Sequence, residues 1–175
     1  MALPSSERPS SQPGGSLDRC FAPELYLQGA LSIAAPRVWV PQAPGVSFSP
    51  ILLNVTEGYY VNILRVQRSG VLSRHRHVGP VHAFTLQGSW RYLEHPWTAN
   101  PGDYVFEPPG ETHTLIVPDG TSEMITLFHV TGGYSYLDDE GQIIGFEDVF
   151  TKLAAARAHF QASGVADEAL ARLIR

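Results

Sequence analysis

Histidines gather in one stretch of this sequence. His75, His77 and His82 lie within eight residues, and His113 follows a turn rich in proline and glycine. Side chains alternate across a β-strand, so His75 and His77 would share one face, roughly 6.6 Å apart along the strand. Two imidazoles placed in this way can converge on one cation, and histidine is a common ligand of zinc, iron, copper and nickel. We interpret the other histidines as structural: His95, His129 and His159.

The segment that leads to His113 has a tightly defined turn. A predicted strand that begins after Gly102 runs into Pro108-Pro109-Gly110, and His113 opens the next strand. Proline holds φ near −65° and glycine allows a positive φ, so this turn has a well-determined geometry. We therefore expect the turn to deliver the His113 side chain to a reproducible position.

The elements that position these histidines are predicted to be β-strands. Short runs rich in Val, Ile, Tyr, Phe and Trp alternate with turns that contain Gly and Pro, and this pattern is typical of an antiparallel sandwich or barrel. The predicted strands are Arg37–Val40, Ser47–Val55, Gly58–Arg68, Val81–Leu86, Trp90–Glu94, Asp103–Glu107, Thr114–Val117 and Glu123–Val130, with one more hairpin formed by Tyr134–Leu137 and Gln142–Ile144.

Only the C-terminal segment is predicted to be helical. Apolar residues recur with helical spacing from about residue 147 to 162, and a shorter helix is expected over residues 167–174. The apolar stripe consists of Val149, Leu153, Ala156 and Phe160.

The 175 residues of the chain are enough for one domain. We expect residues 1–18, which are rich in Ser and Pro, to be a disordered tail. Residues 19–146 are predicted to form the β-barrel domain, and residues 147–175 to form helices packed on the barrel or on a partner subunit.

Composition limits the classes of partner. The net charge is −5, and the chain has no block of basic residues and no apolar run of the roughly 20 residues that a membrane span needs, so we expect neither nucleic-acid nor membrane binding. Cys20 is the single cysteine and the N-terminus lacks the pattern of a secretory signal, so a cytoplasmic location is predicted. Lys152 is the single lysine beside eleven arginines, which we attribute to genome composition.

The two histidine segments together resemble the signature motifs of the cupin superfamily. The second motif, in which glycine, proline, glycine and histidine recur at fixed spacing, is matched in full from Gly102 to His113. In the first motif, four residues separate Gly70 from His75 where the family has five, and His82 stands at the family's glutamate position. The resemblance implies an all-β fold, the cupin double-stranded β-helix or jelly-roll barrel, here with a C-terminal helical appendage.

A closer resemblance covers most of the chain after the tail. The stretches that carry it are VWVPQAPGVSF, NVTEGYYVNILRV, SGVLSRHRH, WRYLEHPW, GDYVFEPPGETHTL, EMITLFHVTG and EDVFTK. They resemble the 2,4′-dihydroxyacetophenone dioxygenases, a family of non-haem iron cupins. That resemblance implies cleavage of the C–C bond of an aryl α-hydroxyketone by O₂, with both oxygen atoms incorporated, to give 4-hydroxybenzoate and formate. It also implies a homodimer or homotetramer.

Carried over residue by residue, the resemblance implies that His75, His77 and His113 hold Fe(II), with Zn or Ni as alternative metals. Three neutral imidazoles leave the charge of +2 on the ion, which favours an anionic bidentate substrate. His82 is a candidate for a fourth ligand or a base. Glu94 is a second candidate, and its facing depends on the turn that begins at Gln87: a two-residue loop places it opposite Ala83, and a three-residue loop opposite His82.

Aromatic residues near the motifs allow two interpretations. Trp90, Tyr92, Tyr104 and Phe84 could line a pocket for an aryl ketone. Aromatic residues that alternate on strands also fill the core of any β-barrel, and we favour this second interpretation for most of them.

Other functions compatible with the motifs are also retained. One is a non-catalytic metal-binding module like the sensor domain of a zinc-dependent anti-sigma factor, although a tail of about 18 residues is too short to supply the usual helical partner domain. Another is a three-histidine β-diketone dioxygenase, or a zinc or manganese isomerase. The intact histidines argue against a storage cupin with a degenerate site.

Overall fold

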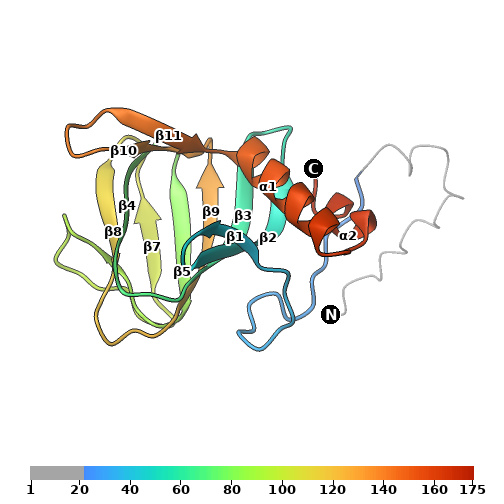
Figure 1. Ribbon diagram of the computed structural model, residues 1–175, viewed down its shortest axis with the longest axis horizontal. Coiled ribbons are helices and arrows are strands. Elements are labelled where there is room, and N and C mark those ends of the chain that lie inside the picture. Colours follow the sequence, from blue (N-terminus) through green and yellow to red (C-terminus); the bar gives the residue numbers. More distant parts are fainter. Residues whose placement is uncertain (1–21) are drawn as a thin grey trace, which may run out of the picture.

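Two antiparallel sheets face each other in the computed structural model, which describes residues 22–175 (Figure 1). The all-β class, with a jelly-roll barrel and small C-terminal helices, is confirmed. The tail expected over residues 1–18 lies outside the described residues.

The larger sheet has six strands in the order β1-β2-β3-β9-β5-β7. Their bounds are β1 Val40–Ala43, β2 Val46–Asn54, β3 Tyr59–Val66, β9 Met124–Thr131, β5 Val81–Gln87 and β7 Tyr104–Glu107. The smaller sheet has the order β11-β10-β4-β8-β6. Its strands are β11 Ile143–Glu147, β10 Tyr134–Leu137, β4 Gly70–His77, β8 Thr112–Val117 and β6 Arg91–Tyr92.

Strand β5 illustrates how the sequence divides between the two faces of a sheet. Val81, Ala83 and Thr85 are buried between the sheets, whereas His82 and Phe84 alternate with them on the outer face. Neighbouring strands continue this pattern, because Ala83 pairs with Phe128 of β9 and Phe128 also faces inward. The period of two that predicts a strand therefore also decides which side chains can reach the interior.

The predicted strands differ from the structure in several places. Strand β4, Gly70–His77, is not among the predicted ranges, and the second strand of the last hairpin covers Ile143–Glu147 instead of Gln142–Ile144. The first strand begins at Val40 and does not include residues 37–39. Strand β6 covers only two residues and pairs with β8 in the smaller sheet, whereas the sequence-based argument paired it with β5. The chain crosses to the other sheet at Gly88, so neither proposed loop length describes the position of Glu94.

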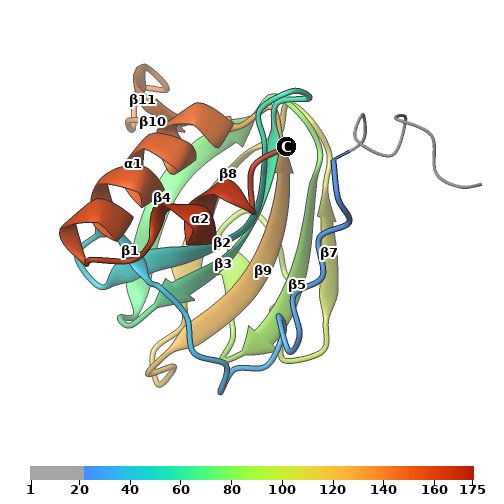
Figure 2. The same cartoon turned by 90° about the vertical axis from the view of Figure 1, so that its right-hand side faces the viewer.

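The helices are α1 (Val149–Ala162) and α2 (Asp167–Ala171). Asp148 caps α1 by accepting hydrogen bonds from Phe150 N and Thr151 N, while Thr151 returns a bond to the Asp148 backbone. Helix α1 contacts β1, β2 and β11, so it lies beside an edge strand of each sheet (Figures 1 and 2). No helix among residues 22–175 has the length and apolar character needed to span a bilayer.

The buried face of α1 differs from the predicted stripe at one position. Its buried residues are Val149, Lys152, Ala156 and Phe160. Lys152, rather than Leu153, completes the stripe, and Lys152 is 2% exposed. The helix therefore directs the single lysine of the chain into the space between the sheets.

Replacing Gly88 by alanine should destabilise the fold more than replacing Gly58. Both glycines have a positive φ, 67° and 71°, which costs an L-residue about 1–2 kcal/mol. A Cβ on Gly88 would also lie 2.9 Å from Thr121 Cγ2 and against the Glu123 carbonyl oxygen, whereas one on Gly58 meets nothing within 4 Å. We expect Gly88→Ala to lower the free energy of unfolding in urea by about 3 kcal/mol or more. Equal losses for Gly88→Ala and Gly58→Ala would contradict this prediction.

Candidate metal centre

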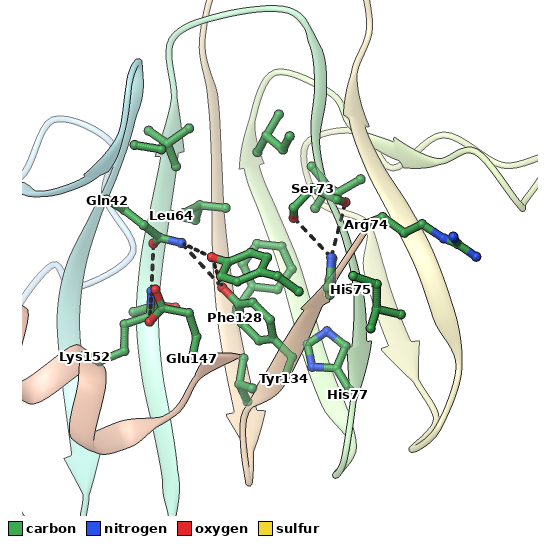
Figure 3. Close-up of a pocket in the computed structure, with 18 of the residues that line it drawn as sticks. Gln42, Leu64, Ser73, Arg74, His75, His77, Phe128, Tyr134, Glu147 and Lys152 are labelled. Atoms are coloured by element: carbon green, nitrogen blue, oxygen red, sulfur yellow. Dashed lines mark hydrogen bonds and ion pairs between the residues drawn. The ribbon is translucent and has the colours of Figure 1, made fainter. Parts of the chain in front are cut away.

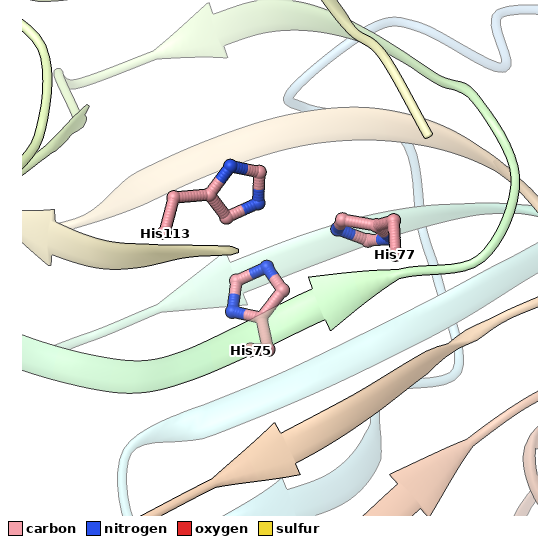
Figure 4. Close-up of side chains that lie close together, drawn as sticks. All are labelled: His75, His77 and His113. Atoms are coloured by element: carbon pink, nitrogen blue, oxygen red, sulfur yellow. The ribbon is translucent and has the colours of Figure 1, made fainter. Parts of the chain in front are cut away.

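Strand pairing brings the three predicted ligand histidines together. His75 and His77 share the inner face of β4, as their spacing predicts, and the register of β4 and β8 places His75 directly opposite His113. The ring centroid of His75 lies 4.9 Å from that of His77 and 4.7 Å from that of His113. The centroids of His77 and His113 are 5.4 Å apart. Figure 4 shows the three rings turned toward one another.

The turn before His113 is fastened to the strand that carries the other two histidines. Gly110 has φ 87°, as predicted for this turn, and its N–H donates to the His77 carbonyl at 2.8 Å. Arg76, on the outer face of β4, donates through Nε to the Gly110 carbonyl at 3.0 Å. These bonds hold His113 in place relative to His77 through the backbone.

Burial keeps the imidazoles in the form that binds metals. His75, His77 and His113 are 5%, 4% and 1% exposed. Desolvation lowers the pKa of His75 well below 6.5, and the neighbouring His77 and His113 lower it further. Desolvation also lowers the pKa of His113 to about 4. Both rings are therefore neutral at pH 7, with a lone pair available for a cation.

A hydrogen bond orients the His75 ring. Nδ1 lies 3.2 Å from Ser73 Oγ and 3.4 Å from the Ser73 carbonyl oxygen. A carbonyl oxygen only accepts, so Nδ1–H is the donor and Nε2 keeps its lone pair. Such a partner outside the ligand shell sets the tautomer of many metal-binding histidines.

A buried carboxylate completes the cluster. Glu107 is 2% exposed, and its Oε2 lies 3.2 Å from His77 Nε2 and 3.5 Å from His113 Nε2. Tyr92 donates from its hydroxyl to Glu107 Oε1 at 2.7 Å, and the Tyr92 ring stacks on His113 with centroids 3.7 Å apart. Glu107 is thus held beside the imidazoles with one oxygen directed at them.

The donor set fits a divalent cation. Buried polar atoms normally have partners, yet four atoms in this cluster have no hydrogen-bond partner among residues 22–175: His77 Nδ1, His113 Nδ1, His113 Nε2 and Glu107 Oε2. One nitrogen from each of the three histidines lies within 4.8 Å of the others. Neutral imidazoles with a nearby carboxylate suit iron, zinc or nickel.

The cluster opens into a cavity of about 470 Å³ between the sheets. Its walls include Tyr92 near the cluster and the apolar side chain of Leu115. Figure 3 shows His75, His77 and Phe128 among the other residues that line it. This volume is in the range of small-molecule sites. A ligand in the cavity would have direct access to two of the three imidazoles.

The structure does not bring His82 to this cluster. His82 lies on the outer face of β5, where its Nδ1 is 2.8 Å from Tyr104 Oη and its ring stacks on His129. The sheet itself separates His82 from the cavity, so the placement gives no support to a fourth ligand or a base. Phe84 and Tyr104 share this outer face, 46% and 51% exposed, and therefore do not line the cavity as substrate contacts.

The remaining predicted site residues, Tyr92, Trp90 and Glu94, lie in three different environments. Tyr92 lines the cavity and binds Glu107. Trp90 is fully buried in the core, with its Nε1 donating to Thr85 at 2.8 Å. Glu94 is exposed and accepts two hydrogen bonds from Thr114, which lower its pKa although partial burial alone would raise it. Glu94 therefore supports strand β8 and does not reach the histidines.

Sequence reasoning missed Glu107 and a polar group at the far side of the cavity. Along β7 the side chains run Tyr104 exposed, Phe106 exposed and Glu107 buried, the reverse of what hydrophobicity predicts. The signal that could have identified Glu107 is its position in the second motif, directly before the turn that leads to His113. The far polar residues are Gln42, Tyr134, Tyr136, Glu147 and Lys152.

Comparison with known proteins finds a cupin-like family model and solved structures with a cupin fold. The model of the ChrR cupin-like domain matches residues 28–135. An RmlC-like cupin protein from Ralstonia eutropha JMP134 is 31% identical with a TM-score of 0.71, over 74% of this chain and 85% of that chain. A second protein with a cupin-like fold from the same organism is 23% identical with a TM-score of 0.65, over 69% and 75%.

The chain is also similar in fold to an acetylacetone dioxygenase from Acinetobacter johnsonii, with 16% identity and a TM-score of 0.60 over 93% of this chain and 99% of that chain. At this identity the likeness shows the fold alone. No curated protein matches the sequence.

Removing one imidazole should remove the metal. We expect His113→Ala to weaken Zn²⁺ or Fe²⁺ binding by more than about 100-fold, since loss of a ligand costs more than the 10- to 100-fold effect of outer partners. His82→Ala is the matched control and should keep wild-type metal content, measured by elemental analysis after dialysis. Full metal content in His113→Ala would contradict the assignment of this ligand.

The metal-free protein should lose stability in acid. The folded state holds His113 with a pKa of about 4, against 6.5 for an ordinary histidine, so the unfolded chain binds protons first as the pH falls. The contribution is complete above pH 6.5 and is lost on acidification toward pH 4, by up to about 3 kcal/mol. Urea unfolding between pH 7 and 4 measures it, and His113→Leu should flatten the dependence. An unchanged pH dependence in His113→Leu would show that other groups carry it.

Proposed function

The chain belongs to the ChrR cupin-like domain family, and within that family we propose that it is an Fe(II)-dependent dioxygenase. The proposed reaction cleaves the C–C bond of an aryl α-hydroxyketone such as 2,4′-dihydroxyacetophenone, with O₂, to give 4-hydroxybenzoate and formate. Both oxygen atoms enter the products and the substrate supplies the electrons, so no further reductant is required.

The observation that carries this proposal is the opening of a three-histidine cluster, through His75 and His77, into a largely apolar cavity. Two of the imidazoles form part of its wall, beside Leu115, Phe128 and Val130. A site whose purpose is only to retain a metal needs no such space, and structural metal sites are closed by their protein ligands. The cavity has the size and apolar lining that an aromatic ketone requires.

Each residue of the cluster has a chemical task in this scheme. His75, His77 and His113 would hold Fe(II), which when bound supplies Lewis acidity for the two substrate oxygens and a path for electrons to O₂. Glu107 does not itself line the cavity, but its Oε2 lies 3.2 Å from Nε2 of His77, which does. It would accept the proton of the substrate hydroxyl once the substrate reaches the ion held by the imidazoles. Tyr92 keeps Glu107 in position through its bond to Oε1.

The substrate class is supported by the charge of the site. Three imidazoles add no charge, and among residues 22–175 Glu107 is the carboxylate in contact with them. A divalent ion there keeps a net positive charge, which favours a deprotonated hydroxyketone that binds through both oxygens. A fold shared with an acetylacetone dioxygenase agrees with a chelating ketone as substrate.

A metal-binding sensor is the second candidate. The family model itself favours it, because that model describes a ChrR cupin-like domain. In this case the histidines would retain zinc, and the cavity would take no oxidisable substrate. The two functions differ in oxygen consumption.

Oxygen uptake tests the proposed reaction. Protein loaded anaerobically with Fe(II) should consume one O₂ for each 2,4′-dihydroxyacetophenone and release equal amounts of 4-hydroxybenzoate and formate. An oxygen electrode and chromatography of the products measure this stoichiometry. Absence of uptake, together with tight retention of zinc, would favour the sensor.

Glu107→Gln should reduce turnover with little change in metal content. The amide keeps the bond from Tyr92 but cannot accept the substrate proton, so we expect kcat to fall by about 10²- to 10⁴-fold. Glu111→Gln makes the same chemical change four residues later, at an acid that pairs with His95 at 2.8 Å, and should leave kcat within about twofold. Full turnover by Glu107→Gln would remove Glu107 from the scheme.

A further inference from the structure

A polar network lies in the cavity on the side away from the histidines. It consists of Gln42 of β1, Tyr134 and Tyr136 of β10, Glu147 of β11 and Lys152 of α1. Figure 3 shows Gln42, Glu147 and Lys152 on one side of Tyr134, and His75 and His77 on the other. None of these network residues is used by the reaction proposed above.

The donors and acceptors along this chain of hydrogen bonds are fixed, starting from Lys152. Its Nζ is buried and donates to Gln42 Oε1 at 2.7 Å and to Glu147 Oε2 at 3.2 Å. An ammonium group has no acceptor atom, so the Gln42 amide must turn its oxygen toward Lys152. Burial lowers the pKa of Lys152 and the Glu147 carboxylate raises it; the ion pair and the bond to Gln42 are the partners that a buried charge needs.

The orientation of the Gln42 amide fixes the hydrogen-bond roles of two tyrosine hydroxyls. With its oxygen occupied, Gln42 Nε2 donates to Tyr136 Oη at 3.0 Å and to Tyr134 Oη at 3.4 Å. Both hydroxyl oxygens are thus acceptors toward Gln42, and each hydroxyl proton must point elsewhere. The two hydroxyls are 3.2 Å apart, so one proton can bond the other hydroxyl.

The second hydroxyl proton has no acceptor among residues 22–175. The hydrogen bonds of the two hydroxyls are those to Gln42 and to each other. Both tyrosines line the cavity. The network therefore presents one hydroxyl donor to whatever occupies the cavity, and a ligand that supplies the missing acceptor gains this hydrogen bond.

Tyr134 sets the distance between this donor and the metal cluster. Strand pairing places Tyr134 opposite His77 and Tyr136 opposite His75. The Tyr134 ring centroid lies 5.1 Å from the rings of both His75 and His77, while its hydroxyl reaches Gln42. The distance from the histidine rings to the hydroxyl donor is thus about the length of one phenol ring. A ligand that reaches both ends needs one aromatic ring between its metal-binding group and a distal oxygen.

We propose that this network is the recognition site for a hydroxyl oxygen carried on the ring of the ketone, opposite the metal-binding group. One of the two tyrosine hydroxyls donates to that oxygen, and Gln42 and Lys152 are positioning residues that set the direction of the donor. The proposal rests on the proposed function, because it assumes that an aryl ketone occupies the cavity. It assigns to the site a preference for a para-hydroxylated ring.

The test compares the binding of two ketones that differ only in the ring hydroxyl. Zn²⁺-loaded protein, which does not turn over, is titrated by calorimetry with 2,4′-dihydroxyacetophenone and with 2-hydroxyacetophenone. We expect the dihydroxy ketone to bind about tenfold more tightly, as one well-made hydrogen bond allows.

Three variants locate the origin of the preference. Tyr134→Phe/Tyr136→Phe keeps both rings and should bind the two ketones equally. Gln42→Met breaks the connection to Lys152 and should reduce the ratio of the two dissociation constants without weakening 2-hydroxyacetophenone. A merely structural role would weaken both ketones together. Tyr59→Phe/Tyr104→Phe removes two hydroxyls outside the cavity and should keep the tenfold ratio.

Equal affinity of the wild-type protein for the two ketones overturns the inference, as does failure to bind either ketone. A preference that survives in the Tyr134→Phe/Tyr136→Phe variant overturns it as well. Oxygen uptake by the Fe(II)-loaded protein distinguishes failure of the recognition site from failure of the proposed function. A tenfold preference without uptake rejects the dioxygenase but keeps the recognition site, and uptake without a preference does the reverse.

Discussion

Burial of uncompensated hydrogen-bonding atoms is the constraint on which this site depends. Three imidazoles and the Glu107 carboxylate lie at most 5% exposed between the sheets, and each buried polar atom left without a partner costs about 1–3 kcal/mol. A bound ligand offsets that cost by satisfying the unpaired atoms. The surrounding β-sheet maintains the arrangement, because β4 lies between β8 and β10 and is hydrogen-bonded to both. Rigid strands thus hold the groups in the geometry that a cation requires.

The predictions that succeeded rest on local rules. A period of two placed His75 and His77 on one face, and the turn at Gly110 adopts the positive φ expected of it. The prediction for His82 failed, although it stands at a motif position, because the same period of two turns it outward between the buried Val81 and Ala83. The argument for the orientation of Glu94 failed for a different reason. Strand β6 pairs with β8 in the other sheet, and the length of the loop before β6 does not determine which sheet it joins.

One of the residues that sequence reasoning missed, Lys152, owes its position to the docking of helix α1. Lys152 is one position from the predicted apolar stripe, and a solvated lysine is the ordinary interpretation of such a residue. It enters the cavity because α1 lies beside β1 and β11, and it stays buried because Glu147 and Gln42 satisfy its charge. The single lysine of the chain therefore lies where a compact ammonium fits, whereas a planar guanidinium would need more donors satisfied.

The two ends of the cavity come from different parts of the chain. The metal cluster is encoded between residues 70 and 113, whereas the distal network, apart from Gln42, is encoded in one continuous segment from Tyr134 to Lys152. That segment is a hairpin followed by a helix and includes none of the histidine cluster. Under the recognition proposed above, exchange of this C-terminal segment between related barrels would change which ligand the cavity binds, while the three histidines would stay in place.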